Sequence, residues 1–194
     1  FTTGEAGPGG GASILHVDSR AAGAGNGRNW FDAFRTLAEG AAAANGGTTE
    51  IWVAEGVYRE GGRLDFATNL SVYGGFAGTE TSRDERSLSR VVTLDGMGLA
   101  RVAAASGTNV LLDGLTLVNG NSGSHGSGLY KDTAGVLTLA NCTFASNTSV
   151  NADKNGLGAY FKGCTVSISN CVFRDHVTAV QRPTGFGFYA ENAA

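Results

Sequence analysis

The chain lacks the features that would direct it to nucleic acid or into a membrane. Only 16% of its 194 residues are charged, its 14 Lys and Arg residues form no basic run, and the formal net charge is −3. Binding to nucleic acid or to an anionic membrane requires a clustered basic face, so neither partner is expected. No apolar stretch approaches the roughly 18 residues of a membrane helix, so no membrane insertion is expected either.

Cysteine is also scarce, and proline occurs only twice. The spacing of Cys142, Cys164 and Cys171 does not match a zinc site. Cys142 and Cys171 hold equivalent places in a repeat and are interpreted as buried thiols in a stacked row. A disulfide between them is allowed but not required. No cofactor or metal is expected. Calcium held by loop oxygens stays an unlocated alternative, with 151–155 as its best short candidate.

The first residues carry no targeting signal of the usual form. The sequence begins at Phe1 rather than Met, and its first four residues contain neither a charged n-region nor an apolar h-region. This predicts a mature or trimmed chain that was exported. Residues 1–13 are rich in glycine and are expected to form a flexible lead-in, whereas 14–194 form a single domain.

Glycine, in contrast, is abundant, with 31 residues, and it marks a repeat. The phrase Gly-x-Gly-x-Tyr occurs at 126–130, 156–160 and 185–189, so its copies are almost evenly spaced. The phrase Asn-Cys-x-Phe occurs at 141–144 and 170–173, with nearly the same spacing. A fixed period of about 30 residues is typical of a solenoid, in which each repeat buries its apolar face against its neighbours.

Aligning the repeats predicts which side chains stack inside the solenoid. Three inward rows follow from the apolar alternation, namely Leu115, Cys142 and Cys171; Leu117, Phe144 and Phe173; and Leu112, Leu139 and Ile168. Gly114, Asn141 and Asn170 fall at one corner, where Gly and Asn tolerate left-handed backbone. The amide side chains of Asn141 and Asn170 are expected to form a hydrogen-bonded ladder, which is a structural role.

The fold class predicted from these patterns is all-β, a right-handed parallel β-helix with one N-terminal capping α-helix. The helix is expected over about 30–45, with Asn29 as its N-cap and Asp32 in its first turn. It would cover the open end of the first coil. The coils are expected over about 50–194. The sequence stops in mid-coil, so the C-terminal end is expected to be uncapped.

Two sets of motifs carry a family resemblance. The Gly-x-Gly-x-Tyr phrase, followed by Phe144-Ala145-Ser146-Asn147, resembles the repeats of chlamydial polymorphic outer membrane proteins, although His176 replaces the Asn in the next repeat. The stretches 16–18, 27–34, 51–58 and 72–81 look like the N-terminal part of many secreted bacterial β-helix proteins. The resemblance implies the fold and export to the cell surface or medium. It implies no catalytic residue.

One pair of carboxylates is the candidate for catalysis. Asp95 and Asp113 each stand just before the final glycine of two similar phrases, 92–96 and 110–114. If one coil can be as short as the step between these phrases, the two carboxylates occupy neighbouring coils about 5 Å apart, close enough for a glycoside hydrolase. The alternative is that each Asp-Gly is a turn dipeptide at a corner.

A second candidate is the charged excursion at 79–90, which contains both acidic and basic residues. A polysaccharide lyase needs a base beside a cation that neutralises the substrate carboxylate. The alternative is a solvated loop with ion pairs between residues three apart.

The sequence favours a non-enzymatic, extracellular structural or adhesive protein. The uncapped last coil offers a strand edge, and head-to-tail stacking of copies through it would build a surface filament. A longer chain that continues the solenoid is the alternative partner at this edge, and a glycan or surface ligand is a further expectation. The alternative function is a carbohydrate-active enzyme, either a polysaccharide lyase or a glycoside hydrolase.

Overall fold

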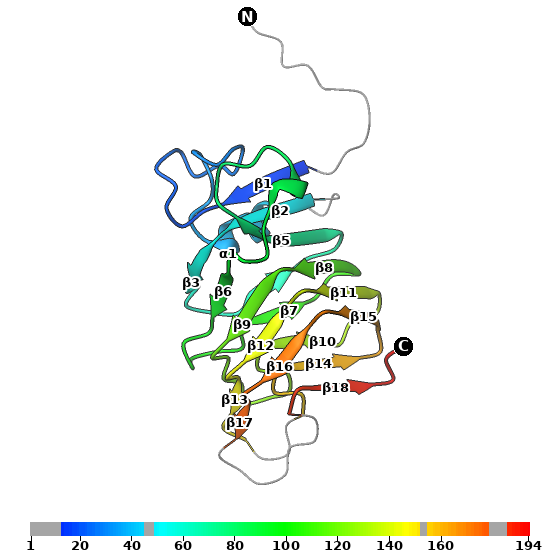
Figure 1. Ribbon diagram of the computed structural model, residues 1–194. Coiled ribbons are helices and arrows are strands. Elements are labelled where there is room, and N and C mark those ends of the chain that lie inside the picture. Colours follow the sequence, from blue (N-terminus) through cyan, green and yellow to red (C-terminus); the bar gives the residue numbers. More distant parts are fainter. Residues whose placement is uncertain (1–12, 45–48, 152–154, 179–185) are drawn as a thin grey trace, which may run out of the picture.

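The computed structural model describes residues 13–44, 49–151, 155–178 and 186–194, and most of its regular structure is parallel β-strand (Figure 1). Three parallel sheets and one two-stranded ribbon contain all the named strands of these ranges. The prediction of an all-β fold built from parallel sheets is confirmed.

The strands are grouped by sheet, each in its order along the stack. Sheet A contains β1 (Ser13–Val17), β2 (Thr49–Ala54), β5 (Leu70–Phe76), β8 (Asn109–Asp113), β11 (Val136–Ala140) and β15 (Thr165–Ser169). Sheet B contains β3 (Gly56–Tyr58), β6 (Val92–Asp95), β9 (Leu115–Val118), β12 (Thr143–Ala145) and β16 (Val172–Arg174). Sheet C contains β4 (Leu64–Phe66), β7 (Ala103–Ala105), β10 (Leu129–Lys131), β14 (Ala159–Lys162) and β18 (Phe188–Glu191). The ribbon pairs β13 (Thr148–Ser149) with β17 (Val177–Thr178).

From β2 onward the chain visits sheets A, B and C in that order, and we call each passage a coil. The five coils begin at β2, β5, β8, β11 and β15. The register places Val72 opposite Leu112, Leu112 opposite Leu139, and Leu139 opposite Ile168. The stretch of chain from Val72 to Leu112 is the longest of the three, because a long loop follows β5. The short coil expected between Asp95 and Asp113 does not occur.

The N-terminal end is closed by one helix, which is shorter than predicted. α1 (Leu37–Ala43) begins after Thr36, whose side chain and that of Glu39 form a reciprocal capping box. Asn29 is therefore not the N-cap. Its side-chain oxygen accepts the Asp32 N–H at 2.8 Å and stabilises a turn ahead of the helix. α1 packs on β1, β2 and β4, which places it over the first coil.

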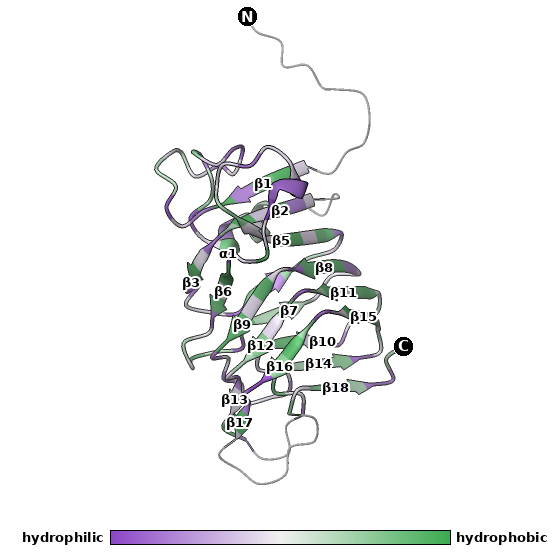
Figure 2. Cartoon of the chain, viewed as in Figure 1, coloured by the Kyte–Doolittle hydropathy of each residue, from purple (hydrophilic) through white to green (hydrophobic). Residues whose placement is uncertain are grey.

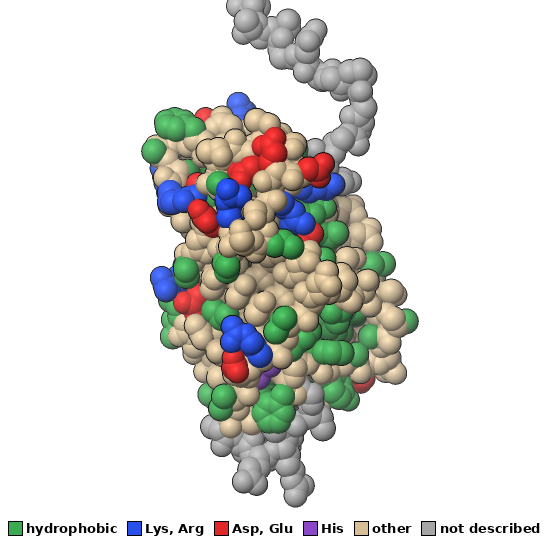
Figure 3. Space-filling model, in the orientation of Figure 1, with side chains coloured by type: hydrophobic (Ala, Val, Ile, Leu, Met, Phe, Trp, Pro, Cys, Tyr) green, Lys and Arg blue, Asp and Glu red, His purple; other side chains and the backbone are tan. Residues whose placement is uncertain are grey.

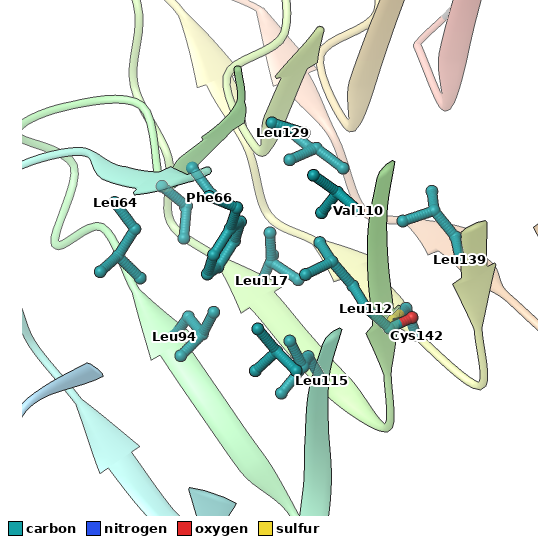
Figure 4. Packing of buried hydrophobic residues seen from close by; sticks show 14 of the residues in the cluster. Leu64, Phe66, Leu94, Val110, Leu112, Leu115, Leu117, Leu129, Leu139 and Cys142 are labelled. Atoms are coloured by element: carbon teal, nitrogen blue, oxygen red, sulfur yellow. Dashed lines mark hydrogen bonds between the residues drawn. The ribbon is translucent and has the colours of Figure 1, made fainter. Parts of the chain in front are cut away.

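The core is a stack of aligned apolar rows. The register aligns Leu117, Phe144 and Phe173, and the rings of the two phenylalanines stack with centroids 4.7 Å apart. Figure 4 draws Leu112, Leu115, Leu117 and Cys142 meeting inside the coils, and Figure 2 places most hydrophobic residues on the strands. Each fully buried Leu or Phe contributes about 1.5–3 kcal/mol, so these rows provide most of the folding energy.

Corners between the sheets use left-handed backbone, as the repeat predicts. Between sheets A and B, Gly114, Asn141 and Asn170 have φ values of 75°, 52° and 50°. At the ends of β12 and β16, Ser146 and Asp175 have φ values of 53° and 57°. Small polar residues tolerate this conformation better than bulky ones, because their short side chains can bond locally.

Candidate functional site

The two candidate catalytic carboxylates do not share a site. Asp95 ends β6 in sheet B, opposite Val118, whereas Asp113 ends β8 in sheet A, opposite Ala140. The prediction that they occupy equivalent places in neighbouring coils is wrong. The phrases are alike because both strands end in an Asp-Gly corner, but the corners belong to different sheets.

The Asp95 carboxylate makes its hydrogen bonds around the corner that follows β6. Its carboxylate accepts the Arg59 Nε at 3.1 Å, the Asn119 Nδ2 at 2.9 Å and the Met97 N–H at 3.0 Å. Burial alone would raise the pKa of this carboxyl, but these hydrogen bonds outweigh it and hold the pKa below its ordinary value. A shallow hollow of about 350 Å³ lies beside it, lined also by Ser146 and Thr148. The arrangement stabilises a turn and offers no second carboxylate.

Asp113 starts a polar ladder along the outside of the stack. Its carboxylate accepts the Arg86 Nη2 at 2.5 Å and the Asn141 Nδ2 at 2.7 Å. The Asn141 Oδ1 in turn accepts the Asn170 Nδ2 at 3.3 Å. Arg86 also donates to the Gly74 carbonyl at 3.2 Å, so the guanidinium ties the long loop to the sheet. Each member is satisfied by the next, which indicates a structural role.

The charged excursion folds over the outer face of sheet A. It contains a 3-10 turn, η1 (Arg83–Glu85). Arg83 and Arg86 pair with residues of sheet A, whereas Arg90 pairs with Glu80 inside the loop at 3.8 Å. Arg83 lies 2.9 Å from a Glu50 carboxylate oxygen and 3.0 Å from the Tyr73 hydroxyl. The expectation of ion pairs three residues apart is therefore wrong for Arg83 and Arg86. In Figure 3, charged side chains gather over this part of the molecule.

Glu80 anchors the start of the same loop. Its carboxylate accepts the backbone N–H groups of Ala77, Gly78 and Thr79 at 2.7–3.0 Å. Burial would raise the pKa of this carboxyl, but the three N–H donors lower it overall. The Glu80 carbonyl accepts the Trp30 Nε1 at 2.8 Å, which joins the loop to the N-terminal region. This carboxylate too is a structural anchor.

A stack of tyrosines runs along the outer face of sheet C. Tyr130, Tyr160 and Tyr189 are in register, with ring centroids 5.5 and 5.7 Å apart and nearly parallel planes. The guanidinium of Arg101 lies 4.3 Å from the Tyr130 ring centre. The Tyr160 hydroxyl donates to Glu191 at 2.8 Å, and burial, helped by that carboxylate, raises the pKa of Tyr160 to about 12. The Tyr160 phenol therefore stays protonated near neutral pH.

The recurring Gly-x-Gly has two separate physical causes. Gly126 and Gly156, the first glycines of the phrase, have φ values of 65° and 62°, which L side chains rarely adopt. The second glycines lie against the next coil. A Cβ on Gly128 would be 2.3 Å from the Gly158 carbonyl oxygen, and one on Gly158 would be 2.2 Å from that of Gly187. The phrase therefore sets the close contact between neighbouring coils.

The Phe-x-x-Asn phrase places a fully buried amide inside the stack. Asn147 is 0% exposed, donates from Nδ2 to the Leu117 carbonyl at 3.1 Å and accepts the Gly120 N–H at 2.8 Å. In the next coil His176 takes this position, and its Nδ1 accepts the Asn147 N–H at 3.2 Å. Its Nε2 is buried and has no hydrogen-bond partner among the described residues.

Stability is expected to fall as the pH drops below about 6.5, the ordinary pKa of histidine, in part because of His176. Burial lowers the pKa of His176 in the folded chain, so the unfolded chain binds more protons in this range. The melting temperature should therefore decrease between about pH 7.5 and about pH 5.5. The melting temperature of His176→Gln, which keeps an acceptor for Asn147, should decrease less. Equal decreases in both proteins would contradict the assignment.

The structure also contains a buried charge that the sequence patterns did not reveal. Lys131 is 1% exposed and points inward from β10, in a row with Ala105 and Phe161. Its Nζ donates to the Gly107 carbonyl at 2.7 Å, the Ala105 carbonyl at 3.3 Å and the Thr133 hydroxyl at 3.1 Å. The alternation Leu129-x-Lys131 is the signal that could have placed it inside.

The described part of the chain offers no ready metal centre. No group of three or more His, Cys, Asp or Glu side chains is placed to hold an ion in these ranges. Of the calcium candidate 151–155, residues 152–154 lie outside the described residues. Cys142, Cys164 and Cys171 are free thiols, and Cys142 and Cys171 lie at neighbouring strands of sheet B.

Comparison with known proteins gives no relative: no family model, curated protein or solved structure matches the sequence. Among the described residues, no helix has both the length and the apolar character needed to span a membrane.

Proposed function

We propose that this chain is a right-handed parallel β-helix that is exported and has a structural or adhesive role. The regular succession of sheets A, B and C through five coils supports the β-helix. The phrases that resemble chlamydial surface-protein repeats support export. The aligned ladders of Phe, Tyr and Asn side chains are typical of a scaffold that gains stability by stacking.

The observation that carries the non-enzymatic role is how the carboxylates are used. Asp95, Asp113 and Glu80 each accept hydrogen bonds from several donors of their own chain. A glycoside hydrolase needs two carboxyl groups about 5–10 Å apart that face the substrate. Since Asp95 and Asp113 lie in different sheets, the pair that suggested a carbohydrate-active enzyme does not support one.

We further propose that copies stack head-to-tail through the last coil. Its inward side chains are much more exposed than their equivalents one coil earlier: Ile168 is 36% exposed, but Leu139 is 0%, and Phe188 is 48% exposed, but Ala159 is 0%. Among the described residues, β16 and β18 of this coil have a strand partner on one side only. Covering these side chains with another copy would bury apolar surface and pair the strand edges.

The N-terminal end of the stack, in contrast, is already covered by its own chain. The outer edge of β1 is already paired by its own chain, because His16 N–H donates to the Gly27 carbonyl at 2.9 Å and Phe34 N–H donates to the His16 carbonyl at 3.0 Å. α1 covers the first coil beside it. The last coil is therefore the better surface for strand addition, and the capped first coil of the next copy would rest on it.

Stacking predicts that the purified chain associates as its concentration rises. Sedimentation velocity should detect species larger than the monomer, and negative-stain electron microscopy should detect fibres. Ile168→Lys combined with Phe188→Lys should keep the chain monomeric, because inward-pointing charges on an edge oppose strand addition.

Val57→Lys combined with Val136→Lys is the matched control. These valines are 48% and 42% exposed, similar to the test residues, but they lie on earlier coils. The control protein should associate like the wild type. A monodisperse wild-type monomer at high concentration, or equal loss of association in both variants, would overturn the stacking proposal.

A further inference from the structure

Two thiols lie side by side at neighbouring strands of sheet B. β12 and β16 are parallel and in register, with Thr143 opposite Val172, so Cys142 and Cys171 form the pair just before it. The Val172 N–H donates to the Cys142 carbonyl at 2.9 Å, which holds the two backbones together beside the sulfurs. Neighbouring strands are about 4.8 Å apart, within the Cα separation of about 4.4–6.8 Å that a disulfide spans.

The two thiols differ in access. Cys142 is 0% exposed and lies in the core beside Leu112 and Leu115 (Figure 4), whereas Cys171 is half-buried in the last coil. The neighbouring Cys142 thiol is the main cause that lowers the pKa of Cys171 to about 7, and the neighbouring Cys171 thiol, with burial, raises the pKa of Cys142. The Cys142 Sγ itself donates to the Ala140 carbonyl at 3.2 Å and the Leu112 carbonyl at 3.4 Å. A half-buried thiol of lowered pKa thus lies next to a fully buried one.

We propose that Cys142 and Cys171 are a reversible dithiol–disulfide pair whose oxidation staples the fourth coil to the fifth. A small-molecule disulfide such as oxidised glutathione is the oxidant. The Cys171 thiolate attacks one of its sulfurs, displaces one glutathione thiolate and forms a mixed disulfide. The Cys142 thiol then loses its proton, attacks the Cys171 sulfur and releases the second glutathione. Two protein thiols are oxidised, and one glutathione disulfide is reduced to two thiols.

Mass spectrometry of the folded protein tests this step. After incubation with oxidised glutathione, the intact chain should lose two hydrogen atoms, and digestion should yield one peptide that links residue 142 to residue 171. Cys164, in the separate hollow beside Gly163 and Asn192, should remain alkylatable after denaturation. The staple closes a loop of about 30 residues, so the melting temperature should rise by about 5–10 °C and return on reduction.

Two serine variants make the result specific. Cys171→Ser should abolish both the mass loss and the melting shift, whereas Cys164→Ser should retain both. Alkylation of Cys142 and Cys171 in the oxidised sample would overturn the proposal. A glutathione adduct that persists on Cys171 would overturn it as well, because the second attack would then be absent. Disulfide-linked dimers in place of the internal bond would also overturn the proposal.

Discussion

Replacing Lys131 by alanine is expected to lower the free energy of unfolding by about 3–5 kcal/mol. The side chain is 1% exposed, so its truncation leaves a cavity in the row that it shares with Phe161. It also removes the donor that satisfies the Gly107 and Ala105 carbonyls where the chain leaves β7. Urea unfolding followed by circular dichroism measures the change.

Lys131→Met separates packing from hydrogen bonding. Methionine fills most of the same volume but cannot donate to the Gly107 carbonyl, so an intermediate loss of about 1–3 kcal/mol is expected. Lys162→Ala is the control, because the Lys162 side chain is 50% exposed in the same coil as Phe161 and makes a surface ion pair with Glu191. It should change stability by no more than about 1 kcal/mol. Equal losses for Lys131→Ala and Lys162→Ala would mean that the buried ammonium has no structural role.

The repeat in the sequence predicted the parts of the fold that repeat locally. The nearly constant step between phrases gives the register of β10 with β14 and of β12 with β16 directly. Parallel in-register strands then bring identical residues together, so the Tyr130–Tyr160 and Phe144–Phe173 stacks follow from the period alone. These registers and ring stacks can be predicted because the neighbouring coils involved have similar lengths.

The same reasoning failed where coils differ in length. Asp95 and Asp113 close similar phrases, and because every corner needs the same turn residues, the phrase does not identify the sheet. The loop after β5 lengthens the second coil and carries Arg86 to Asp113, a contact between distant parts of the chain that no local pattern encodes. The helix was predicted too long because the apolar residues ahead of Thr36 make other contacts: Trp30 packs against Phe76, and Phe34 forms a β-bridge with Val17.

The Gly128→Ala substitution is expected to lower the free energy of unfolding by about 3–5 kcal/mol, although it adds a single methyl group. The new Cβ would lie 2.3 Å from the Gly158 carbonyl oxygen, and the amide of Asn147 is 2.9 Å away. Backbone atoms of two stacked coils cannot yield as a flexible side chain would, so the coils must separate locally. Separation would weaken the Gly128 N–H bond to the Leu157 carbonyl, now 3.0 Å, and loosen the neighbouring tyrosine stack.

Gly62→Ala provides the matched control for this effect. Nothing lies within 4 Å of a Cβ at Gly62, and its backbone is not in the left-handed region. The substitution should be neutral or stabilise the chain by up to about 1 kcal/mol, since it restricts only the unfolded state. If Gly128→Ala behaved like Gly62→Ala in urea unfolding, the close contact between the third and fourth coils would be wrong.

Gly158→Ala then tests how stiff the stack is along its length. Its Cβ would meet the Gly187 carbonyl oxygen at 2.2 Å, which is the same contact one coil further along. Among the described residues, β18 of the fifth coil has a strand partner on one side only and its Phe188 is 48% exposed, so this strand can move away from the new methyl group. Gly158→Ala should therefore cost less than Gly128→Ala in the monomer. Under conditions where copies associate, the difference should shrink, because a coil covered on both faces loses that freedom.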